Sequence, residues 1–403
     1  MGEFFAQLAT VADVYFRQKG MIDDLATLVM ANPWGMGVPS YQRVMMSPYS
    51  RFPLISFHDL SARPHTAADV AGGEGHEHGA WRQEGYHVSC FEQAVLCKLS
   101  GRPQGLAITA KVLYDHMKDH VPIDPLGFGT PDSGPASGPR QAGAAAAVVP
   151  GPAPAHAPTS VHDDTALRVL IEARSGPVRN LLNLHDIVAA CDAANAQGGF
   201  RAGSFTRLSC KVLNTADSPQ LHGNARFYAT AGAVRSAHVL VALHGAGAAN
   251  CFFLEDDNGS TALLEIRACG FGTRYCVWPN WFMQTQLTSR SVTSIRFFAL
   301  NVEDPAQCEP SDYEAAVSAS NGTLRTWGGD DFRARDKHLR LRPSTFVSML
   351  RHVGSLLRNS SAFQAAKAAD RLHGYAVPGG LALGPLCVAN ATELVRKGAP
   401  IIA

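Results

Sequence analysis

The chain lacks a run of about 20 apolar residues, which is the length that a membrane-spanning helix needs. Its first 16 residues do not resemble a signal peptide, because they have no basic start and already contain Glu3 and Asp13. Its nine cysteines include no Cys-x-x-Cys pair, so a zinc ribbon or thioredoxin-like chemistry is disfavoured. A charge excess is also missing, since 35 Lys and Arg stand against 34 Asp and Glu, and we therefore expect no nucleic-acid partner.

Apolar residues are plentiful. They make up 46% of the 403 residues, which predicts a packed globular protein of two domains. A stretch dominated by Pro, Gly and Ala, which includes AGAAAAVVPGPAPAHAP, interrupts this pattern. Its composition offers no apolar face, so residues 122–160 are predicted to be a disordered insert or an interdomain linker. Residues 1–121 would then form an N-terminal α/β domain, and residues 161–403 a C-terminal domain that ends in helices.

The C-terminal domain shows the regular alternation of an α/β fold. Apolar segments at 167–174, 207–213, 238–245 and 261–267 predict buried strands. Helices are expected to begin near Asn183, at Ser218-Pro219 and after Gly245. Strands that alternate with helices form a parallel sheet, and ligands bind at the carboxyl ends of its strands. The residues that follow these strands are therefore candidates for a binding site.

The most informative segment is HGAGAAN, from His244 to Asn250, which follows a strand and opens a helix. Gly245 and Gly247 permit positive φ and let a ligand approach the backbone closely. The start of the helix presents N–H groups and a partial positive charge to a diphosphate. His244 adds a donor for a phosphate oxygen, and Asn250 is placed to hold the helix start. The alternative is a tight strand-to-helix turn that binds nothing.

Three charged side chains are expected at the same edge of the sheet. Arg174 and Arg179 follow the first strand, and a guanidinium group can bind two phosphate oxygens at once. Glu265 lies near the end of the strand at 261–267 and is suited to accept hydrogen bonds from ribose hydroxyls. The alternatives are a pair of surface arginines and an ion pair between Glu265 and a neighbouring Arg.

These motifs resemble those of family 61 glycosyltransferases. That family carries an Arg followed shortly by Arg-x-x-x-Asn, then a strand leading into His-Gly-Ala-Gly-Leu-x-Asn, then a strand with Glu near its end. The chain has EARSGPVRNLLN, HVLVALHGAGAAN and LLEIR in the same order, and CFEQAVLCKLSG upstream is similar to a further family segment. The matching residues are Arg174, Arg179, Asn183, His244, Gly245, Ala246, Gly247, Asn250 and Glu265.

The resemblance implies a B-type glycosyltransferase fold with two Rossmann-like domains, the first of them incomplete in this chain. The C-terminal domain would bind a nucleotide-sugar donor, expected to be UDP-linked, through the matching residues. Residues 1–121 would face a glycan or glycoprotein acceptor. The sugar would be transferred with inversion, with no metal and no other cofactor. Inversion needs a base, for which Asp13, His58 and Asp59 are candidates that no spacing distinguishes.

The resemblance also implies a location in the lumen of the endoplasmic reticulum or Golgi. Four Asn-x-Ser/Thr sequons, at Asn258, Asn321, Asn359 and Asn390, favour the same compartment. A lumenal transferase of this kind is expected to be membrane-anchored. We therefore expect this chain to lack the anchor, and part of the first domain, of a type II membrane protein.

Two other functions stay open. The segment GAGAAN departs from the dinucleotide-binding fingerprint only at its last position, and Glu265 stands near the expected distance for a ribose-binding acid, which suggests an NAD-dependent oxidoreductase. Alternatively, Ala6 and Thr10 occupy positions where the family often has a His and an acidic residue. That departure suggests a non-catalytic relative that still binds a nucleotide or a glycan.

Overall fold

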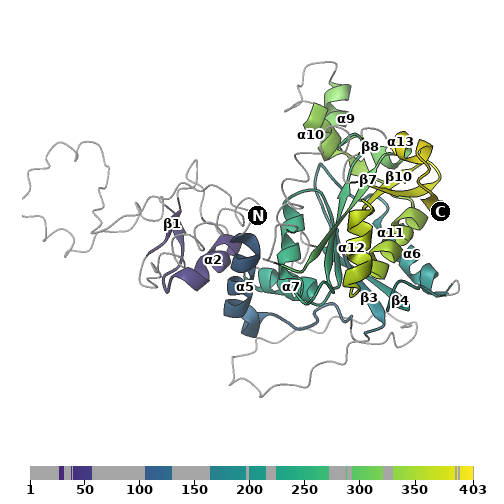
Figure 1. Cartoon of the computed structure of the whole chain (residues 1–403). Helices are drawn as coiled ribbons and strands as arrows, with labels where there is room; N and C mark the ends of the chain where they lie inside the picture. Colours follow the sequence, from purple (N-terminus) through teal and green to yellow (C-terminus); the bar gives the residue numbers. More distant parts are fainter. Residues whose placement is uncertain are drawn as a thin grey trace, which may run out of the picture.

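The computed structural model describes residues 27–30, 38, 40–56, 105–128, 164–196, 199–214, 224–271, 287, 293–320, 330–385, 388 and 391–402. Within these residues the molecule is built around one large, mostly parallel sheet with helices on both of its faces (Figure 1). The α/β class expected from the sequence is therefore confirmed.

Eight strands of the described chain form this sheet, in the order β12-β11-β10-β7-β6-β5-β3-β4. From β4 to β10 every neighbouring pair is parallel, whereas β11 and β12 each pair antiparallel. The strands span Ala166–Ala173 (β3), Arg207–Asn214 (β4), Val239–Leu243 (β5), Ala262–Arg267 (β6), Arg296–Val302 (β7), His373–Val377 (β10), Gly380–Gly384 (β11) and Ile401–Ile402 (β12). The four predicted strands are β3, β4, β5 and β6, and the more central β3, β5 and β6 are mostly apolar because both faces of the sheet are covered.

The chain reverses its direction of winding at β3. From β3 it crosses through α6 (Leu184–Ala196) to β4 on one side, and it then returns to β5 on the other side of β3. The connections that leave the carboxyl ends of β3 and β5 consequently run apart. In open parallel sheets such a point is where ligands bind.

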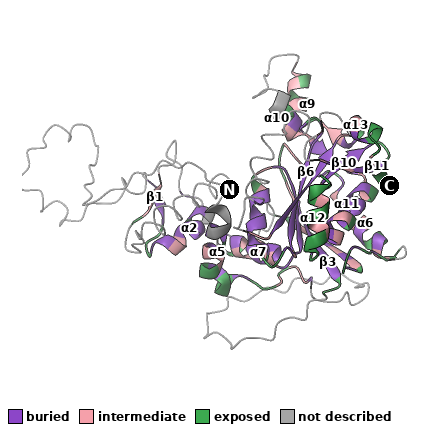
Figure 2. Ribbon diagram, in the orientation of Figure 1, coloured by how far each residue is buried: buried purple, intermediate pink, exposed green. Residues whose placement is uncertain are grey.

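Two helical layers cover the sheet, and each has its own apolar core. On one face α6, α11 (Pro343–Leu356) and α12 (Ser360–Ala368) pack against alternate residues of the strands. On the other face lie α7 (Asn224–Arg235), η5 (Ala246–Phe253) and α5 (Gly105–Met117). Figure 2 shows the strands buried between these layers. The expected C-terminal helices are present, together with β10, β11 and β12.

The described segments before residue 129 extend the second helical layer away from the sheet (Figure 1). They comprise β1 (Val29–Met30), α2 (Ser40–Met46), η3 (Ser47–Tyr49), β2 (Ile55–Ser56), α5 and η4 (Lys118–His120). Met45 and Leu113 are fully buried and share one core with α7 and η5. Phe128, inside the predicted insert, is 3% exposed and joins the same core. The first residues of that insert, 122–128, are thus part of the packed structure, and the rest of it lies outside the described residues.

The remaining elements are short and lie beyond β7. They are η7 (Pro305–Gln307), β8 (Cys308–Glu309), α9 (Asp312–Ala319), α10 (Asp330–Asp336), β9 (His338–Leu339) and α13 (Ala391–Arg396). Strands β8 and β9 form an antiparallel pair. None of the helices in the described part of the chain is long and apolar enough to cross a membrane.

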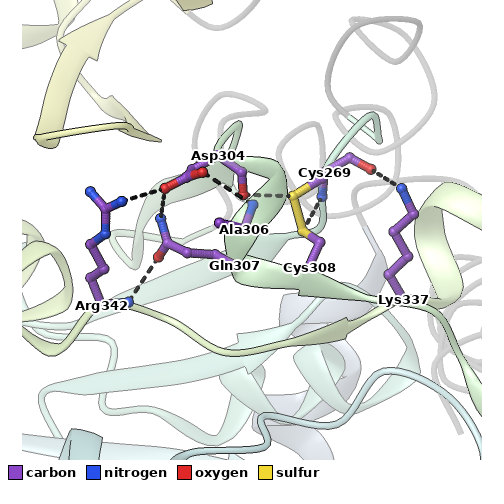
Figure 3. The surroundings of a disulfide bond; sticks show 7 residues. All are labelled: Cys269, Asp304, Ala306, Gln307, Cys308, Lys337 and Arg342. Atoms are coloured by element: carbon purple, nitrogen blue, oxygen red, sulfur yellow. Dashed lines mark hydrogen bonds and ion pairs between the residues drawn. A yellow bond between two sulfur atoms is a disulfide. The ribbon is translucent and has the colours of Figure 1, made fainter.

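Two disulfides join different elements of the fold. Cys191 of α6 is bonded to Cys210 of β4, and Cys269, after β6, is bonded to Cys308 of β8. Figure 3 shows the second bond beside Asp304, whose carboxylate accepts hydrogen bonds from Arg342 and Gln307. The sequence analysis singled out neither pair, because only the fold brings these cysteines together.

Candidate functional site

Polar side chains form two rows across one face of the sheet, near the carboxyl ends of its strands. The strand register places Ala242 beside Glu265, Glu265 beside Ala299, and Ala299 beside His373. Glu172 continues this row on β3, one residue beyond the paired Ile171 and Val241. Two residues further along the strands, the next row contains Arg174, His244, Arg267, Asn301 and Tyr375. We call the first row, which contains the carboxylates Glu172 and Glu265, the acidic row. The second row, which contains Arg174, His244 and Arg267, is basic and lies nearer the edge of the sheet.

Glu265 is fully buried and has both carboxylate oxygens occupied. Its Oε1 lies 2.7 Å from Nδ1 of His244, and its Oε2 accepts a hydrogen bond from Nε of Arg267 at 2.9 Å and lies 2.8 Å from Nη2 of the same residue in an ion pair. Burial alone would raise the pKa of Glu265, but the charges and hydrogen bonds of Arg267 and His244 lower it to about 2. Because an ionised carboxylate only accepts hydrogen bonds, Nδ1 of His244 carries the proton. Glu265 therefore orients His244 and offers no acceptor to a ribose, and the ion pair with a neighbouring Arg is what the structure shows.

Two guanidinium groups converge on the turn after β5. Gly245 has φ +153°, and a Cβ built there would lie 2.7 Å from Nη1 of Arg179 and 2.9 Å from Nη1 of Arg174. Arg179 also donates to the carbonyl oxygen of His244 at 3.2 Å. Burial, and then the like charge of Arg174, lower the pKa of Arg179 to about 10. Two cations held this close together over a glycine backbone are suited to bind an anion.

The loop that carries Arg179 is attached to the segment before α11. The backbone N–H of Arg179 donates to the carbonyl oxygen of Asp336 at 3.1 Å, and its Nε lies 3.4 Å from Oδ1 of the same residue. Leu339 exchanges backbone hydrogen bonds with Asn180 and Leu182 at 2.8 Å each. Asn183 donates from Nδ2 to the carbonyl oxygen of Leu341, also at 2.8 Å. Asn183 therefore anchors this loop, and its amide N–H₂ group is directed at the protein rather than at the arginine pair.

Glu172 is a charged residue that the sequence analysis missed. It is 5% exposed, and its carboxylate lies against the Cα of Gly247, where a Cβ would collide with it. Its Oε2 has no hydrogen-bond partner among the residues that the structure describes. Burial raises the pKa of Glu172 to about 7, although Arg174 and Arg179 act in the opposite direction. The signal in the sequence was a single carboxylate within the otherwise buried strand ALRVLIEA.

The predicted site residues fall into two groups. The structure brings together Arg174, Arg179, His244, Gly245, Ala246 and Gly247 around the turn from β5 into η5. Asn250 is 3% exposed within η5, and Glu265 and Asn183 act as supports. The candidate bases Asp13, His58 and Asp59, the segment CFEQAVLCKLSG, the helix start at Ser218-Pro219, and Ala6 and Thr10 all lie outside the described residues.

No protein-family model matches the chain, and no curated protein matches it either. The chemical role of the site is therefore inferred from its own residues. The turn into η5 supplies backbone N–H groups, and the two guanidinium groups supply positive charge at the point where β3 and β5 diverge. This arrangement is suited to hold a phosphate or diphosphate group.

Replacing Gly245 by alanine tests whether the close approach of the two arginines, and not only the backbone conformation of the turn, requires a glycine at this position. Alanine tolerates this φ poorly and its Cβ would meet both guanidinium groups, so we expect a loss of about 1–3 kcal/mol in stability. Gly176→Ala is the matched control, since Gly176 has φ +157° and nothing within 4 Å of a built Cβ. Thermal unfolding of both variants measures the difference. Equal changes in melting temperature would mean that the arginines do not depend on Gly245.

Proposed function

We propose that the C-terminal part of the chain, residues 161–403, binds a nucleotide sugar, with UDP as the expected nucleotide. The protein then transfers the sugar to a hydroxyl group of a glycan or a protein, with inversion at the anomeric carbon. The observation that carries the proposal is the convergence of Arg174 and Arg179 on Gly245, at the carboxyl ends of β3 and β5. A diphosphate needs such a concentration of donors and positive charge, and neither strand supplies it alone.

The motifs that resemble family 61 glycosyltransferases support the sugar-transfer part of this proposal. Within that proposal, His244 and the turn through Gly245 and Gly247 receive the diphosphate, and Glu265 holds His244 in position. The acceptor side and the base are assigned to residues 1–121 as the first domain of a B-type fold. Strands β1 and β2 support a second parallel sheet there, since Val29 pairs with Ile55 and Met30 with Ser56 in parallel.

The oxidoreductase alternative has less support in this geometry. It needs an acidic side chain at the end of a strand to accept hydrogen bonds from the ribose. Glu265 is 0% exposed and both of its oxygens are already bonded. The glycine turn also follows β5, whereas the dinucleotide fingerprint normally follows the first strand of its domain, which is β3 here.

A lumenal location fits two features of the described residues. Disulfides persist in oxidising compartments, and the fold places two pairs of cysteines in bonding positions. Two of the sequons, Asn258 and Asn359, are exposed. They lie near each other at the amino end of the sheet, where the N–H of Arg358 donates to the carbonyl oxygen of Gly259. Glycans at these positions would leave the carboxyl edge accessible, which is what a lumenal transferase requires.

Calorimetric titration of the full chain with UDP tests the binding step. Arg179→Ala is expected to weaken UDP binding about ten- to a hundredfold, because one charge-assisted contact is worth roughly 1.5–3 kcal/mol. Arg340→Ala is the matched control, since Arg340 forms an exposed ion pair with Glu309 away from the turn. An unchanged affinity in Arg179→Ala would remove Arg179 from the site. Binding of NAD in place of UDP would favour the oxidoreductase.

A second measurement separates an enzyme from a non-catalytic relative. Incubation of the chain with a UDP-sugar should release UDP, either by hydrolysis or by transfer to an added glycan. UDP binding that is never accompanied by release of the sugar would identify a binding protein.

A further inference from the structure

Glu172 is the one carboxylate of the acidic row whose charge is not matched by a close ion pair in the described structure. Glu265, in the same row, has Arg267 at 2.8 Å and His244 at 2.7 Å. Glu172 is influenced by the charges of Arg174 and Arg179, but its Oε2 accepts no hydrogen bond among the described residues. A carboxylate that is 5% exposed and incompletely bonded is costly to keep ionised.

Among the residues that the structure describes, few other charges surround Glu172. On its own strand and the loop after it are Arg174 and Arg179, and beyond Arg179 are Asp336 and Arg335, which pair with each other at 2.7 Å. Its neighbours in the sheet are Leu213 of β4 and Ala242 of β5, which are apolar. The covering element η5 presents Gly247, and its only titratable group is the buried thiol of Cys251. His244 and Glu265 complete the set and are bonded to each other.

The formal charges around the turn show which protonation state of Glu172 favours binding of a diphosphate. Arg335 and Asp336 cancel, so Arg174 and Arg179 contribute two positive charges and an ionised Glu172 contributes one negative charge. The diphosphate of a nucleotide sugar carries two negative charges. The two arginines therefore match the ligand only when Glu172 is neutral, and an ionised Glu172 would repel it from a buried position, where screening by solvent is weak.

We propose that Glu172 is a proton-accepting residue of the binding site, and that binding of a diphosphate beside Arg174 and Arg179 is coupled to uptake of one proton by its carboxyl group. The inference rests on the proposed function and adds a binding residue to it. The proton comes from solvent and is bonded to a carboxylate oxygen of Glu172, and no covalent bond of the ligand changes. The bound anion replaces Glu172 as the partner of the arginines' charge.

The coupling has a definite direction. Since the pKa of Glu172 is raised to about 7 without ligand, a bound anion raises it further. Below this pH the carboxyl group is already neutral, and binding takes up little proton. Above it, each pH unit weakens binding up to about tenfold, until the pKa of the complex is reached. The affinity of the protein for its ligand is thus expected to fall between about pH 7 and pH 8.5.

Titration calorimetry with UDP-GlcNAc in two buffers of different ionisation enthalpy tests the proposal. UDP-GlcNAc is the suitable probe because both of its phosphates are esterified and do not titrate in this range, unlike the terminal phosphate of UDP. For the wild-type chain at pH 8 we expect uptake of roughly two thirds of a proton, and close to none at pH 5.5. Glu172→Gln should take up no proton and should bind at pH 8 about as tightly as the wild type does at pH 5.5.

Glu303→Gln is the matched control, because burial raises the pKa of Glu303 to about 7 as well, whereas Glu303 is not among the charges that act on Arg179. This variant should retain the proton uptake of the wild type. Binding without proton uptake in the wild type, which requires no variant, would overturn the inference and leave the proposed function standing. Uptake that persists in Glu172→Gln would overturn it as well. Absence of UDP-GlcNAc binding at every pH would overturn the proposed function and the inference together.

Discussion

Glu265→Ala is expected to lower the free energy of unfolding by about 3–5 kcal/mol, which is the usual cost of removing one partner from a buried ion pair. Arg267 is 2% exposed and would lose the carboxylate that neutralises it in the core. His244 would lose the acceptor of its Nδ1 proton at the same time. A decrease of roughly 10 °C in melting temperature is expected for a domain of this size.

The matched control for this variant is Glu309→Ala. Glu309 also pairs with an arginine, Arg340, at 2.9 Å, but 45% of its side chain and 53% of that of Arg340 are exposed. An exposed pair contributes about 0–1 kcal/mol, so this control should hardly change the unfolding midpoint. Denaturant unfolding at neutral pH compares the two variants. A similar small effect of both would show that Glu265 does not compensate a buried charge.

Removing the disulfide between Cys269 and Cys308 is expected to have the second largest effect. The bond closes a loop of 39 residues, and its loss in the double variant Cys269→Ala/Cys308→Ala should cost about 4 kcal/mol through the entropy gained by the unfolded chain. The bond between Cys191 and Cys210 spans 19 residues, so the corresponding double variant should lose about 3 kcal/mol. Thermal unfolding with and without a reducing agent measures both losses.

Treatment with a reducing agent distinguishes the loss of the two disulfides from other effects of replacing cysteine. Wild-type protein should lose stability in the reducing agent, while a variant that lacks both bonds should not respond to it. Cys251→Ala is the control for loss of a thiol alone, since Cys251 is buried and unbonded to another cysteine. If wild-type stability does not change on reduction, the two bonds are not formed in the protein, and the support that they give to a lumenal location is lost.

The strands could be predicted because a strand that is buried on both faces of its sheet is mostly apolar along its length. Strand β5 is apolar throughout, β3 and β6 are mostly apolar, and each overlaps a segment predicted from periodicity. Strands β7 and β10 were not predicted, although RFFALNV is as fully buried as the others. A short apolar run of this kind cannot be distinguished from a buried helix segment by periodicity alone.

The chemical roles were harder to predict than the positions. His244, Glu265 and the glycines were located at the carboxyl edge of the sheet, but the contact between Glu265 and His244 depends on how β5 pairs with β6. Arg267 lies two residues later on the same strand, so both side chains project from one face, and a buried pair results. Glu172 was missed for the same reason. Its importance follows from the approach of Arg179 and Gly247, which come from later parts of the chain.

The attachment of the loop that carries Arg179 bears on how a ligand would be received. Its backbone is hydrogen-bonded to Asp336 and Leu339, and Asn183 holds Leu341 at its far end. The conformational entropy of this loop is therefore lost when the protein folds and not when the ligand arrives. A prearranged arginine lets more of the contact energy appear as affinity. Substitutions of Asp336 or Leu339, which would contact no ligand, should consequently weaken binding by loosening the loop, with a more unfavourable entropy of association as their calorimetric signature.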